Sequence, residues 1–293
     1  MSALKQLWLT ADSATRIIVA NVAVFILLNV PVSILHLMNA GGGYNWFGDW
    51  LYLNGSLRNL LFHPWTIFTH MFVHGGVMHL LFNMLSLFFI YQLFKRYFSD
   101  RQFVNVYFAG GLAGGLTFIL SVNLFPLFGG MAAGHFALGA SAAVMAVLVS
   151  VCTYRPSDHV FLFGVFRMQL RWIAIIFVLL DLINISGGNE GGHLAHLGGA
   201  LFGFLWGINL GKGRDISAFF QPVQDFFKFE QKSKSRLKVA HKAPVSNENW
   251  NSSRKAKEEK VNEILDKISR SGYDSLSKSE KALLFELSKD KDT

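Results

Sequence analysis

Long apolar runs fill the first two thirds of this 293-residue chain, and the charged residues between them stand in short clusters. A helix needs about 20 mostly apolar residues to cross the hydrocarbon core of a bilayer. Six segments reach or approach that length: Ile17–Met38, Val77–Phe98, Phe103–Phe125, Leu138–Tyr154, Leu170–Ile185 and His193–Leu210. The pattern therefore predicts an all-α polytopic membrane protein built on a six-helix transmembrane bundle.

The composition changes after the last apolar run, and this change predicts the domain boundaries. We expect a six-span membrane domain over 1–214, a basic flexible linker over 215–252 and a cytosolic helical hairpin over 253–293. In the last segment Ser277 and Glu280 have the spacing of a capping box, and apolar residues recur at helical intervals before Gly272. The partner of this tail cannot be read from its sequence.

Charge adds an orientation to the bundle. The chain carries a net charge of +8, and 18 of its 27 lysines and arginines lie from Lys212 onward. Basic residues gather on the cytosolic side of membrane proteins. Counted over alternate loops and both flanks, 26 of the 27 fall on one side, and Arg58 alone falls on the other. Both termini are therefore predicted to be cytosolic, and the basic tail is interpreted as a membrane flank, with no nucleic-acid partner.

The loop between the first two spans, 39–76, is too apolar for a solvated connection. It is rich in tryptophan and phenylalanine, among them Trp46, Trp50, Phe62 and Trp65. Aromatic residues with amphipathic rings favour the boundary between membrane and water. We expect this loop to lie in the membrane interface.

Polar side chains inside spans are costly, so each one calls for a function or a partner. With the predicted orientation, His79 and Asn83 lie in the outer half of the second span. Ser141 and His196 each lie about three residues inside the outer ends of the fourth and sixth spans. Four polar side chains from three helices are thus predicted at one side of the membrane and at similar depth.

The surroundings of these residues favour a contact between the serine and the histidine. Gly199, Gly203 and Gly207 follow His196 on one helix face, and such faces let two helix backbones approach closely. A serine needs a base to become a nucleophile, and histidine is the usual base. No carboxylate is expected to orient His196, so a Ser-His dyad that needs no cofactor is predicted. Asn83, His79 or the backbone N–H of Ser141 would supply donors for an oxyanion.

Three short motifs in this order resemble those of the rhomboid intramembrane serine proteases. They are His-Leu-Leu-Phe-Asn at 79–83, Gly-Ala-Ser-Ala at 139–142 and Ala-His-Leu-Gly-Gly at 195–199. The resemblance spans about residues 15–212 and implies a six-helix bundle with a water-filled cavity open to the outside. It also implies cleavage near the outer membrane face of single-span membrane proteins, with Ser141 as nucleophile, His196 as base, and His79 and Asn83 stabilising the oxyanion. Ala142 departs from the family pattern, which usually has glycine there.

Other interpretations of the same residues remain open. A catalytically inactive rhomboid-like scaffold that binds membrane clients is the main alternative, and Ala142 weakly favours it. A metal site at the histidines is disfavoured, because no acidic residue is expected beside His193 and His196. His70 and His74 are interpreted as interfacial loop residues, and Asp181 is favoured as a structural partner of a neighbouring helix. Similarity to prokaryotic six-span members predicts a bacterial plasma membrane.

Overall fold

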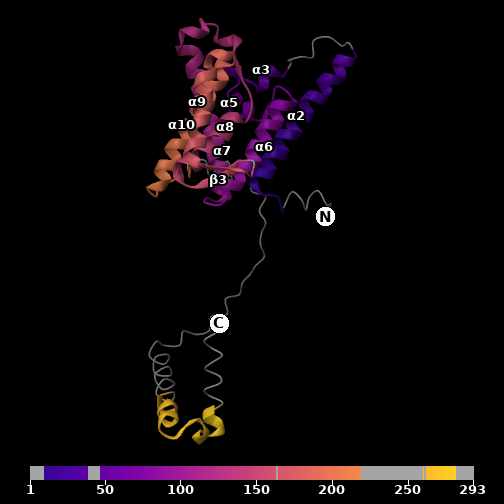
Figure 1. Ribbon diagram of the computed structural model, residues 1–293. Helices are drawn as coiled ribbons and strands as arrows, with labels where there is room; N and C mark the ends of the chain where they lie inside the picture. Colours follow the sequence, from indigo (N-terminus) through magenta and orange to yellow (C-terminus); the bar gives the residue numbers. More distant parts are fainter. Residues whose placement is uncertain (1–9, 39–46, 163, 219–259, 261, 282–293) are drawn as a thin grey trace. The chain divides into compact units, whose positions relative to one another are not determined.

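The computed structural model describes residues 10–38, 47–162, 164–218, 260 and 262–281. The chain divides into two compact units, 1–231 and 232–293, which are described separately. The first unit is a helical bundle, and the second is a small helical tail, drawn in yellow in Figure 1.

Each of the six predicted spans corresponds to a helix of the bundle. They are α2 (Ser13–Leu37), α6 (Val77–Phe94), α7 (Asp100–Leu124), α8 (Ser141–Tyr154), α9 (Leu170–Asn184) and α10 (Glu190–Gly211). Among the described residues, five helices are long and apolar enough to cross a membrane, and α8 is the short one, at 14 residues. At 1.5 Å per residue α8 spans only about 21 Å. The six helices, five of them long enough to cross a bilayer, confirm the predicted all-α six-helix bundle of a multi-pass integral membrane protein.

The short helix α8 forms the centre of the bundle (Figure 1). Eleven of its fourteen residues are buried, and α7, α10, α6 and α9 all pack against it. Most of its residues are small or β-branched, so neighbouring backbones can come close on several sides. The glycines of α7 serve this packing, because a Cβ on Gly110 would collide with Ala146 of α8.

The connection between α2 and α6 is described from Phe47 onward and is folded. It contains α3 (Gly48–Leu51), β1 (Leu53–Asn54), α4 (Leu57–Phe62), α5 (Thr66–Thr69) and the 3-10 turn η1 (His70–Phe72). β1 pairs antiparallel with β2 (Phe136–Ala137), the strand that leads toward α8. Trp65 donates its indole N–H to the Trp50 carbonyl and stacks on its ring. Leu57, Leu61 and Phe62 are exposed on α4, as an interfacial segment requires; Trp46 lies outside the described residues.

A β-hairpin joins α8 to α9 at the end of the bundle opposite α3 (Figure 1). It consists of β3 (His159–Leu162) and β4 (Phe166–Gln169). Two further short 3-10 turns, η2 (Pro126–Phe128) and η3 (Ala132–Gly134), lie between α7 and β2, and η4 (Ile185–Gly187) follows α9. After α10 the described chain continues to residue 218, and Asp215 accepts hydrogen bonds from the Trp206 indole and from Ser217.

The tail unit is described over 260 and 262–281. A helix over 262–271 is followed by the 3-10 turn η6 (Tyr273–Ser275). The predicted capping box is present: Ser277 donates its backbone N–H to the Glu280 carboxylate at 2.6 Å, and Glu280 donates its backbone N–H to the Ser277 hydroxyl. Lys267 closes the hairpin with an ion pair to Glu280 at 3.0 Å. Residues 278–281 are helical, and the rest of the predicted second helix lies outside the described residues.

Candidate active site

Ser141 is the first residue of α8, at the end of a segment that hydrogen bonds hold in place. Gly139 donates its N–H to the His70 carbonyl at 2.8 Å, and Ala140 donates its N–H to His74 Nε2 at 3.4 Å. Gly139 has a φ of +112°, and a Cβ there would lie 2.8 Å from the His79 ring. Glycine is therefore required, both for the backbone conformation and for the space beside His79.

The two helices that carry the predicted dyad begin elsewhere than the sequence indicated. α8 begins at Ser141, three residues later than predicted, and α10 begins at Glu190, three residues earlier. His196 is therefore the seventh residue of its helix, about 9 Å from its start. The prediction of equal positions along the two helices is wrong. The residues from Leu138 to Ala140 were predicted to be helical, but they form a non-helical segment that leads into α8.

The structure nevertheless brings the two side chains into contact. His196 Nε2 and Ser141 Oγ are 2.7 Å apart, a hydrogen-bond distance. The glycine face of α10 allows this approach: a Cβ on Gly199 would collide with the carbonyl of Ala142, and one on Gly203 with that of Ala146.

Ala142 replaces the glycine of the family pattern without obstructing the nucleophile. The side chain is buried, and a Cβ on Gly114 of α7 would lie 2.5 Å from the Ala142 methyl. The glycine at 114 therefore makes the space that the methyl group occupies between α8 and α7.

A carboxylate stands directly beside His196, contrary to the sequence prediction. Asp181 Oδ1 on α9 lies 2.8 Å from His196 Nδ1 and 2.8 Å from His193 Nδ1. The residue is only 6% exposed. A carboxylate inside a membrane span is energetically costly, and this cost was the only sequence feature that could have pointed to a role for Asp181. The contact itself was missed because it joins two different helices across 15 positions of sequence.

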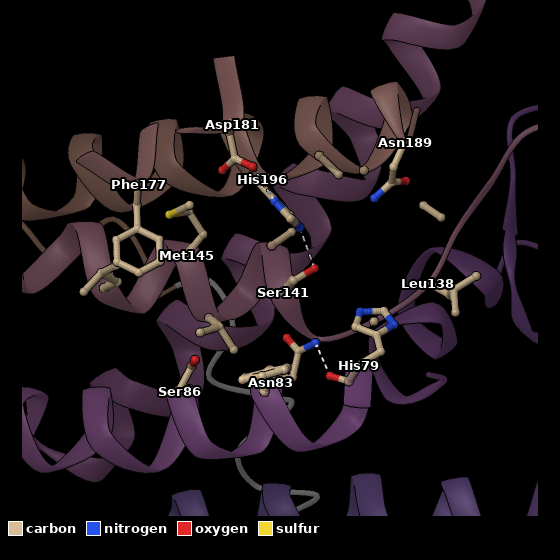
Figure 2. Close-up of a pocket in the computed structure, with 18 of the residues that line it drawn as sticks. His79, Asn83, Ser86, Leu138, Ser141, Met145, Phe177, Asp181, Asn189 and His196 are labelled. Atoms are coloured by element: carbon tan, nitrogen blue, oxygen red, sulfur yellow. Dashed lines mark hydrogen bonds and ion pairs between the residues drawn. The ribbon is translucent and has the colours of Figure 1, made fainter. Parts of the chain in front are cut away.

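Ser141, His196 and Asp181 border one cavity of about 630 Å³ between α6, α8, α9 and α10. Figure 2 shows Asp181, His196 and Ser141 in a row, with His79 and Asn83 across the cavity on α6. Asn83 donates one amide N–H to the His79 carbonyl at 2.9 Å. All four site residues expected from the sequence thus line the same space.

The amino end of α8 supplies further donors beside Ser141. Val144 donates the first intrahelical hydrogen bond, to the Ala140 carbonyl. The N–H groups of Ser141 and Ala142 precede it and have no partner within the helix. Such groups carry the positive end of the helix dipole, which favours a negatively charged oxygen nearby.

His70 and His74 lie in the connection between α2 and α6, as predicted, but they are buried there and support the segment that leads to Ser141. They are 3% and 2% exposed. Burial lowers the pKa of His70 to about 4. Burial, together with the nearby His79, lowers the pKa of His74 to about 4. Both rings are therefore neutral at pH 7, and His74 can accept the Ala140 N–H.

Asp181, His193 and His196 are also a residue set that could hold a metal ion, with ligand atoms within 4.8 Å of one another. The prediction that no acidic residue accompanies the two histidines is wrong. The separations of 2.8 Å are hydrogen-bond lengths. They are shorter than the spacing of about 3.3 Å that tetrahedral zinc with ligand bonds of about 2 Å requires. The geometry favours hydrogen bonding.

Comparison with known proteins identifies the family of this site. A sequence model of the Rhomboid domain matches residues 62–213, which is more than half of the chain and includes Ser141, His196 and the cavity between them. The chain belongs to the rhomboid family. A second model, a family of unknown function (DUF6576), matches residues 247–290 of the tail.

Curated relatives of this rhomboid domain include two proteins whose names contain the word mitochondrial and one whose name contains the word protease. The human presenilin-associated rhomboid-like protein, mitochondrial, is 29% identical over 204 residues, covering 68% of this chain and 48% of its own. The presenilin-associated rhomboid-like protein A, mitochondrial, of Danio rerio is 33% identical over 145 residues, covering 48% of this chain and 36% of its own. Rhomboid protease GluP of Bacillus subtilis is 26% identical and covers 50% and 26%.

The chain thus spans about half or less of the length of these relatives. The mitochondrial names do not support the prediction of a bacterial plasma membrane.

Proposed function

We propose that this rhomboid domain is an intramembrane serine protease that hydrolyses peptide bonds in or near transmembrane segments of other membrane proteins. The observation that carries the proposal is the 2.7 Å contact between Ser141 Oγ and His196 Nε2 inside the cavity. Ser141 Oγ attacks the carbonyl carbon of the substrate, and His196 takes the hydroxyl proton. His196 then returns that proton to the leaving amine, and water releases the acyl group by the same route.

Charge that develops on the substrate carbonyl oxygen needs fixed donors. Asn83 retains a second amide N–H, since only one is bonded to the His79 carbonyl. The Ser141 N–H at the start of α8 lies beside the nucleophile, and His79 borders the same cavity. These groups form the proposed oxyanion site. The reaction draws on no cofactor.

The walls of the cavity favour an apolar substrate segment. Phe82 of α6 and Phe177 and Leu180 of α9 line the cavity and are exposed. A substrate helix that approaches between α6 and α9 would meet these side chains before it reaches Ser141. Single-span membrane proteins are therefore the proposed substrates, with the lipid bilayer as the medium in which they arrive.

The end of the bundle that carries the β3–β4 hairpin is proposed to face the inner, basic side of the membrane. Arg155, Arg167 and Arg171 lie in or beside this hairpin. Ser141 follows the connection that includes β2, which pairs with β1 near α3. The cavity would then open toward the outer side, where water is available for hydrolysis.

Cleavage of a single-span substrate by the purified protein tests this function. Ser141→Ala and His196→Ala should each lower kcat by about 10⁴-fold or more, because the nucleophile or its base is lost. Ser150→Ala is the matched control: Ser150 is a buried serine on the same helix that donates to the Val147 carbonyl and does not line the cavity. Full cleavage by Ser141→Ala would exclude the mechanism.

The inactive scaffold is the alternative, and covalent labelling separates the two. A fluorophosphonate probe should label wild-type protein at Ser141 and leave Ser141→Ala unlabelled, because only an activated serine attacks the probe. A scaffold that merely binds membrane clients would remain unlabelled in the wild type.

A further inference from the structure

We infer that Asp181 is a positioning residue for His196, so that the site works as a Ser141–His196–Asp181 triad rather than as a dyad. This inference rests on the proposed protease function. It goes beyond that function by assigning a role to Asp181 on a third helix, α9. Asp181 acts through His196 and makes no contact with the reacting atoms.

The hydrogen bonds around Asp181 determine which nitrogen of His196 carries the proton. An ionised carboxylate only accepts hydrogen bonds, so the 2.8 Å contact requires a proton on His196 Nδ1. A neutral imidazole with its proton on Nδ1 has a lone pair on Nε2. That nitrogen is the one 2.7 Å from Ser141 Oγ. Asp181 therefore selects the tautomer in which His196 can act as a base.

His193 holds the carboxylate in place. Its Nδ1 lies 2.8 Å from the same oxygen, Asp181 Oδ1. Two imidazoles from successive turns of α10 thus donate to one oxygen atom, which limits the rotation of the carboxylate. Because Asp181 is on α9, the orientation of His196 depends on how α9 packs against α10.

A purely structural role does not explain the choice of a carboxylate. Side-chain exposure of Asp181 is 8%, and Oδ2 has no hydrogen-bond partner among the described residues. Burying an ionised group with an unpaired oxygen is expensive. An amide could bridge the two helices at lower cost. The negative charge of Asp181 stabilises His196 electrostatically when His196 becomes positively charged during the reaction.

The proton balance of the step is simple. The Ser141 O–H bond breaks, the new N–H bond forms on His196 Nε2, and the oxygen bonds to the substrate carbonyl carbon. His196 is then an imidazolium, and Asp181, which keeps its charge and takes no proton, stabilises it across the Nδ1–H bond. His193 and His79 are the other titratable groups near this ring.

Two substitutions at this position test the inference. Asp181→Asn and Asp181→Ala should each lower kcat by about 10²-fold to 10⁴-fold, because the counter-charge is lost and the tautomer is no longer selected. KM should change by less than about threefold, since Asp181 does not bind substrate. Asn184→Ala on the same helix is the matched control: Asn184 is exposed and donates only to the Leu180 carbonyl.

A spectroscopic measurement makes the test independent of the variants' folding. Nitrogen NMR of histidine-labelled wild-type protein should show His196 protonated on Nδ1 and unprotonated on Nε2. The opposite tautomer in the wild type would overturn the inference. So would folded Asp181→Asn protein that keeps more than half of the wild-type kcat.

Cleavage by the variants, with and without a chelator, separates the triad from a dyad and from a metal site. If Ser141→Ala abolishes cleavage while both Asp181 variants remain fully active, the triad fails and the protease stands. If Ser141→Ala cleaves normally, the proposed function itself fails. Treatment with EDTA should leave wild-type kcat unchanged. If EDTA abolishes cleavage and zinc alone restores it, Asp181, His193 and His196 hold a metal ion instead.

Discussion

Gly139 shows how a single residue shapes the approach to the nucleophile. It combines a left-handed φ of +112° with a position against the His79 ring. Its N–H is also bonded to the His70 carbonyl. The backbone conformation, the space beside His79 and the hydrogen bond to His70 therefore all constrain this glycine, which lies two residues before Ser141.

We expect Gly139→Ala to lower the reactivity of Ser141 while the helix content of the protein stays unchanged. The Cβ would lie 2.8 Å from His79 and strain the backbone, which costs about 1–3 kcal/mol and displaces Ser141 from His196. The rate of fluorophosphonate labelling should fall by about tenfold or more. Gly129→Ala is the control, because Gly129 also has a positive φ but open space around its Cβ. Equal effects of both variants would contradict the role given to the His79 contact.

At the scale of secondary-structure elements, α10 and α8 are held together by backbone contact. Gly199, Gly203 and Gly207 lie in one row against α8. Hydrophobic burial gives little force between helices in lipid, so close packing of small residues holds them together. The position of His196 relative to Ser141 depends on this spacing.

Gly203→Ala should therefore move α10, with His196, away from α8, which carries Ser141. Its added methyl would collide with the Ala146 carbonyl, a backbone atom that cannot rotate away. We expect a loss of about 1–3 kcal/mol in stability, seen as a lower thermal midpoint, together with slower fluorophosphonate labelling. Gly211→Ala near the end of the same helix meets nothing within 4 Å and should match the wild type in both measurements. Unchanged labelling by Gly203→Ala would show that His196 does not depend on this contact.

At the scale of the whole molecule, buried neutral histidines should make the membrane domain sensitive to acid. His70 and His74 have folded-state pKa values lowered to about 4 by burial, against 6.5 when unperturbed. Between these values the unfolded chain binds more protons than the folded one, so stability falls as the pH falls. It is full above about pH 6.5 and is lost progressively toward pH 4.

The thermal midpoint in detergent should accordingly drop by about 5 °C or more between pH 7 and pH 5. His74→Gln should flatten this dependence, whereas His159→Gln, at a histidine outside the buried core, should leave it unchanged. A midpoint that does not vary over this range would contradict the buried, neutral state of both rings.

The sequence by itself determined the six-helix architecture and four of the residues that meet in the cavity, namely His79, Asn83, Ser141 and His196. Apolar length is a local property, so each span could be recognised without its neighbours, although helix ends shifted by several residues. The motifs around His79, Ser141 and His196 and the glycine row after His196 could also be recognised, because each lies on one segment.

Only the tertiary structure decided what surrounds those residues. Asp181 meets His196 across two helices, and His74 meets Ala140 across 66 positions of sequence. Contacts of this kind follow from how helices are rotated and packed, which no local pattern encodes. The start of α8 at Ser141 could not be predicted for the same reason, because His70 and His74 bind the backbone N–H groups of Gly139 and Ala140, which lie outside the helix. The sequence thus indicated a serine and a histidine, and the packing of α9 against α10 added the carboxylate.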